Sequence, residues 1–127
     1  MRVTMTNDRT KSYFDDIVMR ASRASIVRRE PWSDASPNCC HANVEAFVRA
    51  SAEYQIVCGW LVGNGRWLMP HSVVRHTLSG QLVDITPDPS GSAFPFVEHR
   101  GTEADFVVLR QGREGGWLYP PLAAISE

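Results

Sequence analysis

The hydrophobic pattern of the chain changes its period near Tyr54, and this change constrains the fold more than any other feature. Before it, apolar residues recur at helical spacing in two segments, at about 12–25 and 40–53. After it come short β-rich runs separated by turn residues, at about 55–62, 66–77, 81–86, 94–99 and 105–110. Consecutive strands joined by short turns pair antiparallel. We therefore predict an α+β fold with N-terminal helices packed on an antiparallel sheet of about four or five strands.

Length and composition set the class of protein. A chain of 127 residues, 43% hydrophobic and 21% charged, fits one globular domain over 1–127, with a flexible polar arm over 1–10. A net charge of −1 gives little attraction to nucleic acid or to an anionic membrane, so we expect neither as a partner. The start of the chain lacks the apolar core of a signal peptide, and no run could span a membrane, so we expect a cytoplasmic protein.

The cysteines favour a free thiol chemistry over a disulfide framework. There are three, Cys39, Cys40 and Cys58, and the first two are adjacent, so a bond between them would be strained. In a reducing compartment each is a thiol, a metal ligand or a nucleophile. We interpret Cys58 as a small buried hydrophobe.

Cys40 opens the second helical segment on its inward face. Val44, Phe47 and Val48 follow it by four, seven and eight residues, whereas Cys39 points about a third of a turn away. At a helix N-terminus, unpaired N–H groups and the helix dipole favour a thiolate. The same N–H groups could hold a developing oxyanion. Cys40 is therefore the candidate nucleophile.

A histidine and an acid follow on later strands. His71 could deprotonate the thiol and then protonate a leaving group. Asp84 lies in an apolar strand, where a carboxylate is costly unless it is paired, and it could fix the tautomer of His71. Of the other histidines, we expect His41 to point off the inward face of its helix, so that it is not the base.

The pairing register decides which acid reaches His71. A two-residue turn at Ser79-Gly80 would place Asp88 opposite His71 and Asp84 opposite Arg75, although all of these carboxylates share the face of His71. A longer loop or a bulge near Pro70 would bring Asp84 closer. We choose Asp84 as the acid and keep Asp88 in reserve. An Arg75–Asp84 ion pair is the alternative role for that carboxylate.

These motifs resemble those of the papain-like cysteine hydrolase and transglutaminase-like superfamily. The resemblance covers about 38–87 and rests on four stretches: Cys40-His41-Ala42-Asn43-Val44, Gly59-Trp60, His71-Ser72-Val73-Val74 and Gly80-Gln81-Leu82-Val83-Asp84-Ile85-Thr86-Pro87. It also extends to small bacterial proteins with a Cys-His-x-Asn-Val motif. It implies a papain-like or transglutaminase-like core and a Cys40, His71, Asp84 triad.

The chain departs from that pattern beside the nucleophile. It lacks a Cys-Trp pair, and no glutamine precedes Cys40 in the loop, so Asn38 or a backbone amide would be the second oxyanion donor. We expect Trp32 and Trp60 to line the substrate pocket.

The expected function is that of a thiol-dependent amide hydrolase or acyl transferase. It would act on a peptide or protein amide as a peptidase, deamidase or transamidase, through a thioester and without a metal or other cofactor. Two alternatives stay open. One is a non-catalytic binding domain on the same fold. The other is a zinc-binding module using Cys39, Cys40, His41 and His71, although this spacing lacks a Cys-x-x-Cys pair.

Overall fold

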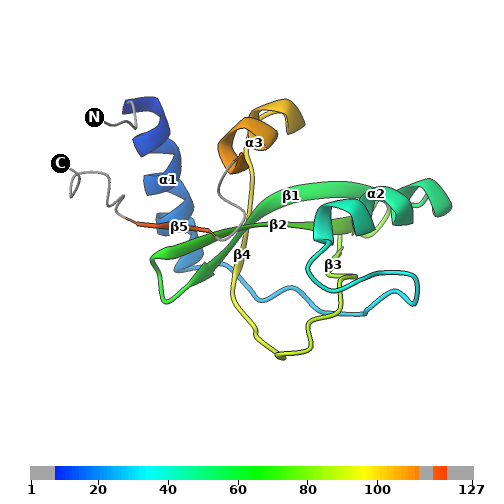
Figure 1. Ribbon diagram of the computed structural model, residues 1–127. Coiled ribbons are helices and arrows are strands. Elements are labelled where there is room, and N and C mark those ends of the chain that lie inside the picture. Colours follow the sequence, from blue (N-terminus) through cyan, green and yellow to red (C-terminus); the bar gives the residue numbers. More distant parts are fainter. Residues whose placement is uncertain (1–7, 112–115, 120–127) are drawn as a thin grey trace.

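The computed structural model describes residues 8–111 and 116–119. Its elements, in chain order, are α1 (Asp8–Ala21), α2 (Cys40–Ala50), β1 (Tyr54–Gly63), β2 (Trp67–His76), β3 (Leu82–Val83), β4 (Phe96–Glu98), α3 (Glu103–Arg110) and β5 (Trp117–Leu118). Helices and a curled antiparallel sheet make this the predicted α+β fold (Figure 1). No helix among these residues is long and apolar enough to cross a membrane.

The β1–β2 hairpin is the centre of the sheet. The strand order is β3-β2-β1-β4, with β5 also beside β2, and every pair is antiparallel. Asn64 and Gly65 both have positive φ, 55° and 72°, which is what a tight hairpin turn requires. The predicted hairpin at Gly63-Asn64-Gly65 is confirmed, and its register places Gly59 opposite His71 and Trp60 opposite Pro70.

The outer edge of β2 has a gap between its two partners. β5 pairs with Trp67 and Leu68, whereas β3 pairs with Val74 and Arg75. The bond from His76 N to Gln81 O shows that even-numbered residues of β2 direct their backbone groups to this edge. Pro70 is even-numbered and lies in the gap, so it removes no hydrogen bond from the ladder.

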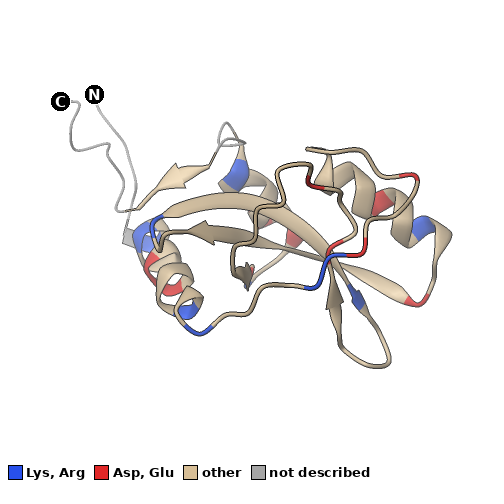
Figure 2. Ribbon diagram, turned by 90° about the horizontal axis from the view of Figure 1, so that it is seen from below, with Lys and Arg blue, Asp and Glu red and all other residues tan. Residues whose placement is uncertain are grey.

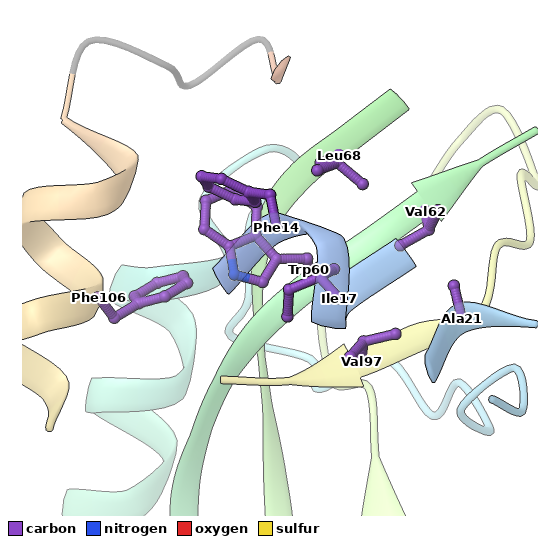
Figure 3. Packing of buried hydrophobic residues seen from close by; sticks show 8 residues of the cluster. All are labelled: Phe14, Ile17, Ala21, Trp60, Val62, Leu68, Val97 and Phe106. Atoms are coloured by element: carbon purple, nitrogen blue, oxygen red, sulfur yellow. The ribbon is translucent and has the colours of Figure 1, made fainter. Parts of the chain in front are cut away.

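The two faces of the hairpin are covered differently. In Figure 1, α1 and α3 rise above the hairpin, α2 lies across its right-hand part, and the loops before α2 and after β3 run beneath it. The helical face holds one core cluster, with Phe14 and Ile17 of α1, Trp60 of β1 and Phe106 of α3 at its centre (Figure 3). Burying each such side chain contributes roughly 1.5–3 kcal/mol.

A smaller cluster holds α2 on the same face. Val44 is 1% exposed and packs against Val74, Val83 and Ile85. Because side chains alternate along a strand, Val74 and Ser72 face α2, and His71 lies on the opposite face. That face has its own cluster, formed by Val57, Val73 and Phe96.

Residues 103–110 form a helix, so the strand predicted over 105–110 is wrong. The hydroxyl of Thr102 accepts a hydrogen bond from Asp105 N at 3.1 Å and caps this helix. Phe106 is the buried residue of this helix, with 1% of its surface exposed. Val107 and Val108 are β-branched residues of the kind that is enriched in strands, which is why this run predicted a strand, and in the helix both are exposed to solvent.

Candidate active site

The chain fixes Cys40 at the first residue of α2. Asn38 adopts a positive φ of 64° and turns the loop into the helix. Asn43 then fastens this loop, because its side chain accepts from Ser36 N (3.1 Å) and donates to Ser36 O (2.8 Å). The same amide donates to the hydroxyl of Thr86 at 3.0 Å. Asn43 therefore links the loop before Cys40 to the segment that carries Asp84.

His71 and Asp84 form a direct hydrogen bond. His71 Nε2 lies 2.7 Å from Asp84 Oδ2, and the Asp84 side chain is 4% exposed. The second carboxylate oxygen of Asp84 accepts from Thr86 N at 3.1 Å, which fixes the carboxylate plane. Nε2 is engaged by the acid, so Nδ1 is the ring nitrogen left to face a thiol.

The loop between β2 and β3 explains why Asp84 reaches His71. It spans 77–80, closed by hydrogen bonds from His76 N to Gln81 O and from Gly80 N to His76 O. The two-residue turn considered above is therefore wrong, and Arg75 pairs with Leu82. A shift of two residues keeps every side chain on its predicted face. It moves Asp84 level with Val73, diagonally beside His71.

The alternative role for Asp84 is also wrong. Arg75 Nη2 lies 2.6 Å from Glu98 Oε1, not beside Asp84. Asp84 instead leaves β3 and bridges to Arg29, with Asp84 N donating to Arg28 O at 2.8 Å. Asp88, the reserve acid, accepts from Ser90 N and Ser90 Oγ at 2.9 and 2.6 Å. Asp88 lines the groove but forms no hydrogen bond with His71 among the described contacts.

Cys40 and His71 shift each other's pKa in opposite directions. Burial would raise the pKa of Cys40, but hydrogen bonds from His41 and His71 outweigh it and lower that pKa from 9.0 to about 6. Burial would lower the pKa of His71, but its bonds to Asp84 and Cys40 raise it from 6.5 to about 9. Between these values the pair is a thiolate and an imidazolium.

His41 is a second histidine at the thiol, which the sequence interpretation missed. The expectation that it points off the inward face is wrong: His41 Nδ1 lies 2.7 Å from the hydroxyl of Ser72 on β2. Its ring also contacts Phe106 edge-on, with centroids 5.8 Å apart. Ser72 is 1% exposed, so this bond holds the imidazole in place beside Cys40. The sequence signal for this contact was Ser72, a polar residue at a strand position that faces α2.

A groove of about 500 Å³ gives access to these groups. Cys40, His41 and His71 line it together with Asn38. Its remaining walls include three apolar side chains, Trp67, Met69 and Phe94, and four polar or charged ones, Arg29, Asp88, Ser90 and Ser92. Arg29 Nη2 lies 3.8 Å from both Asp84 and Asp88. Figure 2 shows basic and acidic residues side by side where these loops cross below the sheet.

Two tryptophans predicted to line the pocket lie elsewhere. Trp60 is 0% exposed in the helical-face core (Figure 3). Its Nε1 donates to the Tyr13 hydroxyl at 2.8 Å. Trp32 packs edge-on against Phe47 of α2, with ring centroids 5.3 Å apart. Neither of them lines the groove. The tryptophan that does line it is Trp67, the first residue of β2.

Gly59 makes room beside His71. A Cβ at this position would lie 2.6 Å from the ring of Phe96, so only glycine fits under that ring. Phe96 in turn meets the His71 ring edge-on, with centroids 6.3 Å apart. The Gly59-Trp60 pair thus serves both faces of the sheet: the glycine lets Phe96 reach His71, and the tryptophan fills the core.

Comparisons with protein-family models, curated proteins and solved structures found no match to this chain. The interpretation of the site therefore depends on its geometry. Within 8–111 and 116–119, no group of three or more His, Cys, Asp or Glu side chains is arranged to hold a metal ion. The zinc alternative has no ligand set among those residues.

Proposed function

We propose that this protein is a thiol-dependent amide hydrolase or acyl transferase with Cys40 as nucleophile, His71 as acid and base, and Asp84 as the residue that orients His71. The observation that carries the proposal is the 2.7 Å bond between His71 Nε2 and Asp84 Oδ2, which leaves Nδ1 for Cys40 at the start of α2. This arrangement keeps the thiol ionised near neutral pH, where an ordinary thiol is mostly protonated.

The reaction follows from these positions. The Cys40 thiolate attacks the amide carbonyl, and the new oxyanion accepts hydrogen bonds from the N–H groups at the start of α2 and from Asn38. His71 then gives its Nδ1 proton to the leaving nitrogen as the C–N bond breaks, which forms a thioester on Cys40. In the second half, neutral His71 takes a proton from water or an amine that attacks the thioester, and the thiolate leaves.

The proposal includes the papain-like or transglutaminase-like core. Its support is the order of the parts: a helix that begins at the cysteine, then a strand with the histidine, then the acid. The open groove beside Cys40 suits an extended peptide or a protein side-chain amide better than a bulky metabolite. The three proposed groups complete the reaction without a cofactor.

The test is acyl transfer from an activated ester. Mixing the protein with p-nitrophenyl acetate should give a burst of p-nitrophenol close to one equivalent, and mass spectrometry should find the acetyl group on Cys40. Cys40→Ala should abolish the burst, while Cys39→Ala, one residue away and exposed, should keep it. If the wild type gives no burst, or if Cys40→Ala keeps it, Cys40 is not a nucleophile. A non-catalytic binding domain would then be the better interpretation.

A further inference from the structure

A second cavity adjoins the groove on the face of the sheet that carries His71. It has a volume of about 240 Å³, and its walls include Val27, Leu61, Val73, Phe94 and Phe96. Arg29, Leu61 and Phe94 line both this cavity and the groove. The two hollows therefore meet at these three side chains.

The cavity lies directly behind the proposed His71–Asp84 pair. Asp84 forms part of its wall, and Phe96, another wall residue, touches the His71 ring edge-on. A carbonyl carbon attacked by Cys40 must lie beside His71. Leu61, at the shared boundary, is the diagonal neighbour of His71 on the same face of the hairpin, because His71 pairs with Gly59 and Leu61 pairs with Met69. The substituent on that carbon is therefore close to this boundary.

The chemistry of the walls selects an uncharged apolar group. Val73 is 0% exposed and Phe96 is 5% exposed, so the floor is formed by fixed hydrophobic side chains. Three charged residues also line the cavity, and each has a partner of opposite charge: Arg29 Nη2 lies 3.8 Å from Asp84 Oδ2, and Arg28 Nη2 lies 2.8 Å from Glu30 Oε2. An alkyl group entering this space exchanges water for apolar contacts on most sides.

We propose that this acyl cavity holds an alkyl group attached to the scissile carbonyl, so that the protein selects amides of apolar acyl groups. This inference rests on the proposed function, because that function places the carbonyl at Cys40. A branched amino-acid side chain in a peptide and the chain of a fatty acyl amide share this chemistry.

The test measures binding without requiring turnover. Short aliphatic amides (acetamide, butanamide, hexanamide and octanamide) compete with iodoacetamide for Cys40, and mass spectrometry follows the labelling of that residue alone. The inhibition constant should fall about fourfold for each methylene that enters the cavity. N-acetyl-leucinamide is measured beside hexanamide. Tighter binding of the leucine compound assigns the cavity to a peptide side chain, and tighter binding of hexanamide assigns it to a fatty acyl chain.

A variant that plugs the cavity completes the test. Ala93 is exposed at its rim, so Ala93→Phe should fill the entrance without disturbing the core. Ile26, 58% exposed at the same rim, gives a second variant, Ile26→Asp, which places a charge there. Both should abolish the dependence on chain length. The control Ala104→Phe, exposed on α3, should keep it.

Two results would overturn the inference. One is equal protection of wild-type Cys40 by acetamide and octanamide, and the other is an unchanged dependence on chain length in both plugged variants. Neither result bears on the ester burst, which tests the proposed function separately. An absent burst together with protection that depends on chain length would leave an apolar binding site beside a thiol that does not accept acyl groups.

Discussion

A thiolate persists inside a protein only where donors surround it, and the residues around Cys40 supply two. His71 is held by Asp84, and His41 is held by Ser72 at 2.7 Å. The two imidazoles come from different elements, one from β2 and one from the first turn of α2. Together they outweigh the burial that would otherwise raise the pKa of Cys40.

Removing His41 should raise the pKa of the Cys40 thiol from about 6 towards its ordinary value, because one of its two donors is lost. The pH at which iodoacetamide labelling of Cys40 reaches half its maximum rate measures this pKa. His41→Ala should move that pH upwards by about one unit or more. Ser72→Ala should move it in the same direction by less, since the ring stays but loses its anchor.

His76→Gln is the control for this prediction, because His76 bonds Ser79 at the far end of β2. Its labelling profile should match that of the wild type. A wild-type midpoint in His41→Ala would mean that His71 alone sustains the thiolate.

Asp84→Asn should slow acylation by ~10–10³-fold while the protein stays folded. The amide keeps an acceptor for Thr86 N but no longer stabilises the His71 imidazolium. The readout is the burst rate with p-nitrophenyl acetate, beside a thermal melt. Arg75→Ala is the matched control on β2, because it loses only the partly exposed pair with Glu98, worth about 0–1 kcal/mol. Equal burst rates in the two variants would remove Asp84 from the reaction.

The sequence predicted Cys40, His71 and Asp84, which the structure brings together, but it did not predict all of their neighbours. Alternation along the strands was enough to place His71 and Asp84 on one face, whatever the loop length. Their contact depended on a four-residue loop over 77–80, which single-sequence reasoning could not choose. Trp60 was misplaced although the hairpin at Asn64-Gly65 already put it on the face opposite to His71.

The start of α3 carries a local helix signal in the sequence. Thr102-Glu103-Ala104-Asp105 is a helix-start pattern, and the structure uses Thr102 as the N-cap. The apolar run after it dominated the prediction of a strand. In contrast, the predicted ends of α2, β1 and β2 agree with the structure within a few residues. In these elements the hydrophobic pattern continues over a long segment, and turn residues mark its ends.

Thr102→Ala should lower the free energy of unfolding by about 1 kcal/mol, because Asp105 N loses its acceptor. Chemical denaturation measures this loss. Labelling of Cys40 should stay fast, since Phe106 of α3 meets the His41 ring edge-on and the cap takes no part in that contact. Ser33→Ala, exposed in the loop before α2, is the control. A wild-type stability for Thr102→Ala would show that the cap contributes nothing to α3.

The two faces of the sheet differ in what they carry. The face beneath the helices holds the larger core, with Phe14, Ile17 and Trp60 fully buried. The opposite face presents His71 and the acyl cavity to the loops. Cys40 belongs to a helix on the first face and meets a histidine from the second at the gap in the outer edge of β2. This layering places the proposed nucleophile and its histidine at a sheet edge while both faces remain packed.

The ion pair also sets how the stability of the whole molecule depends on pH. Because the pKa of His71 rises from 6.5 to about 9, its contribution is full below pH 6.5 and is lost as the pH rises to about 9. Because the pKa of Cys40 falls from 9.0 to about 6, its contribution is full above pH 9 and is lost as the pH falls to about 6. The two slopes have opposite signs.

We therefore expect these slopes to cancel between about pH 6.5 and 9, since one proton resides on the pair in both the folded and the unfolded state. The measurement is the free energy of unfolding of the wild type minus that of Cys40→Ser/His71→Asn, at several pH values in this window. The difference should stay constant, because all other titrating groups are common to both proteins. In Cys40→Ser alone, only the histidine slope remains, so its stability relative to the double variant should fall as the pH rises. A wild-type difference that changes by about 1.4 kcal/mol per pH unit would mean that only one member of the pair is charged in the folded protein.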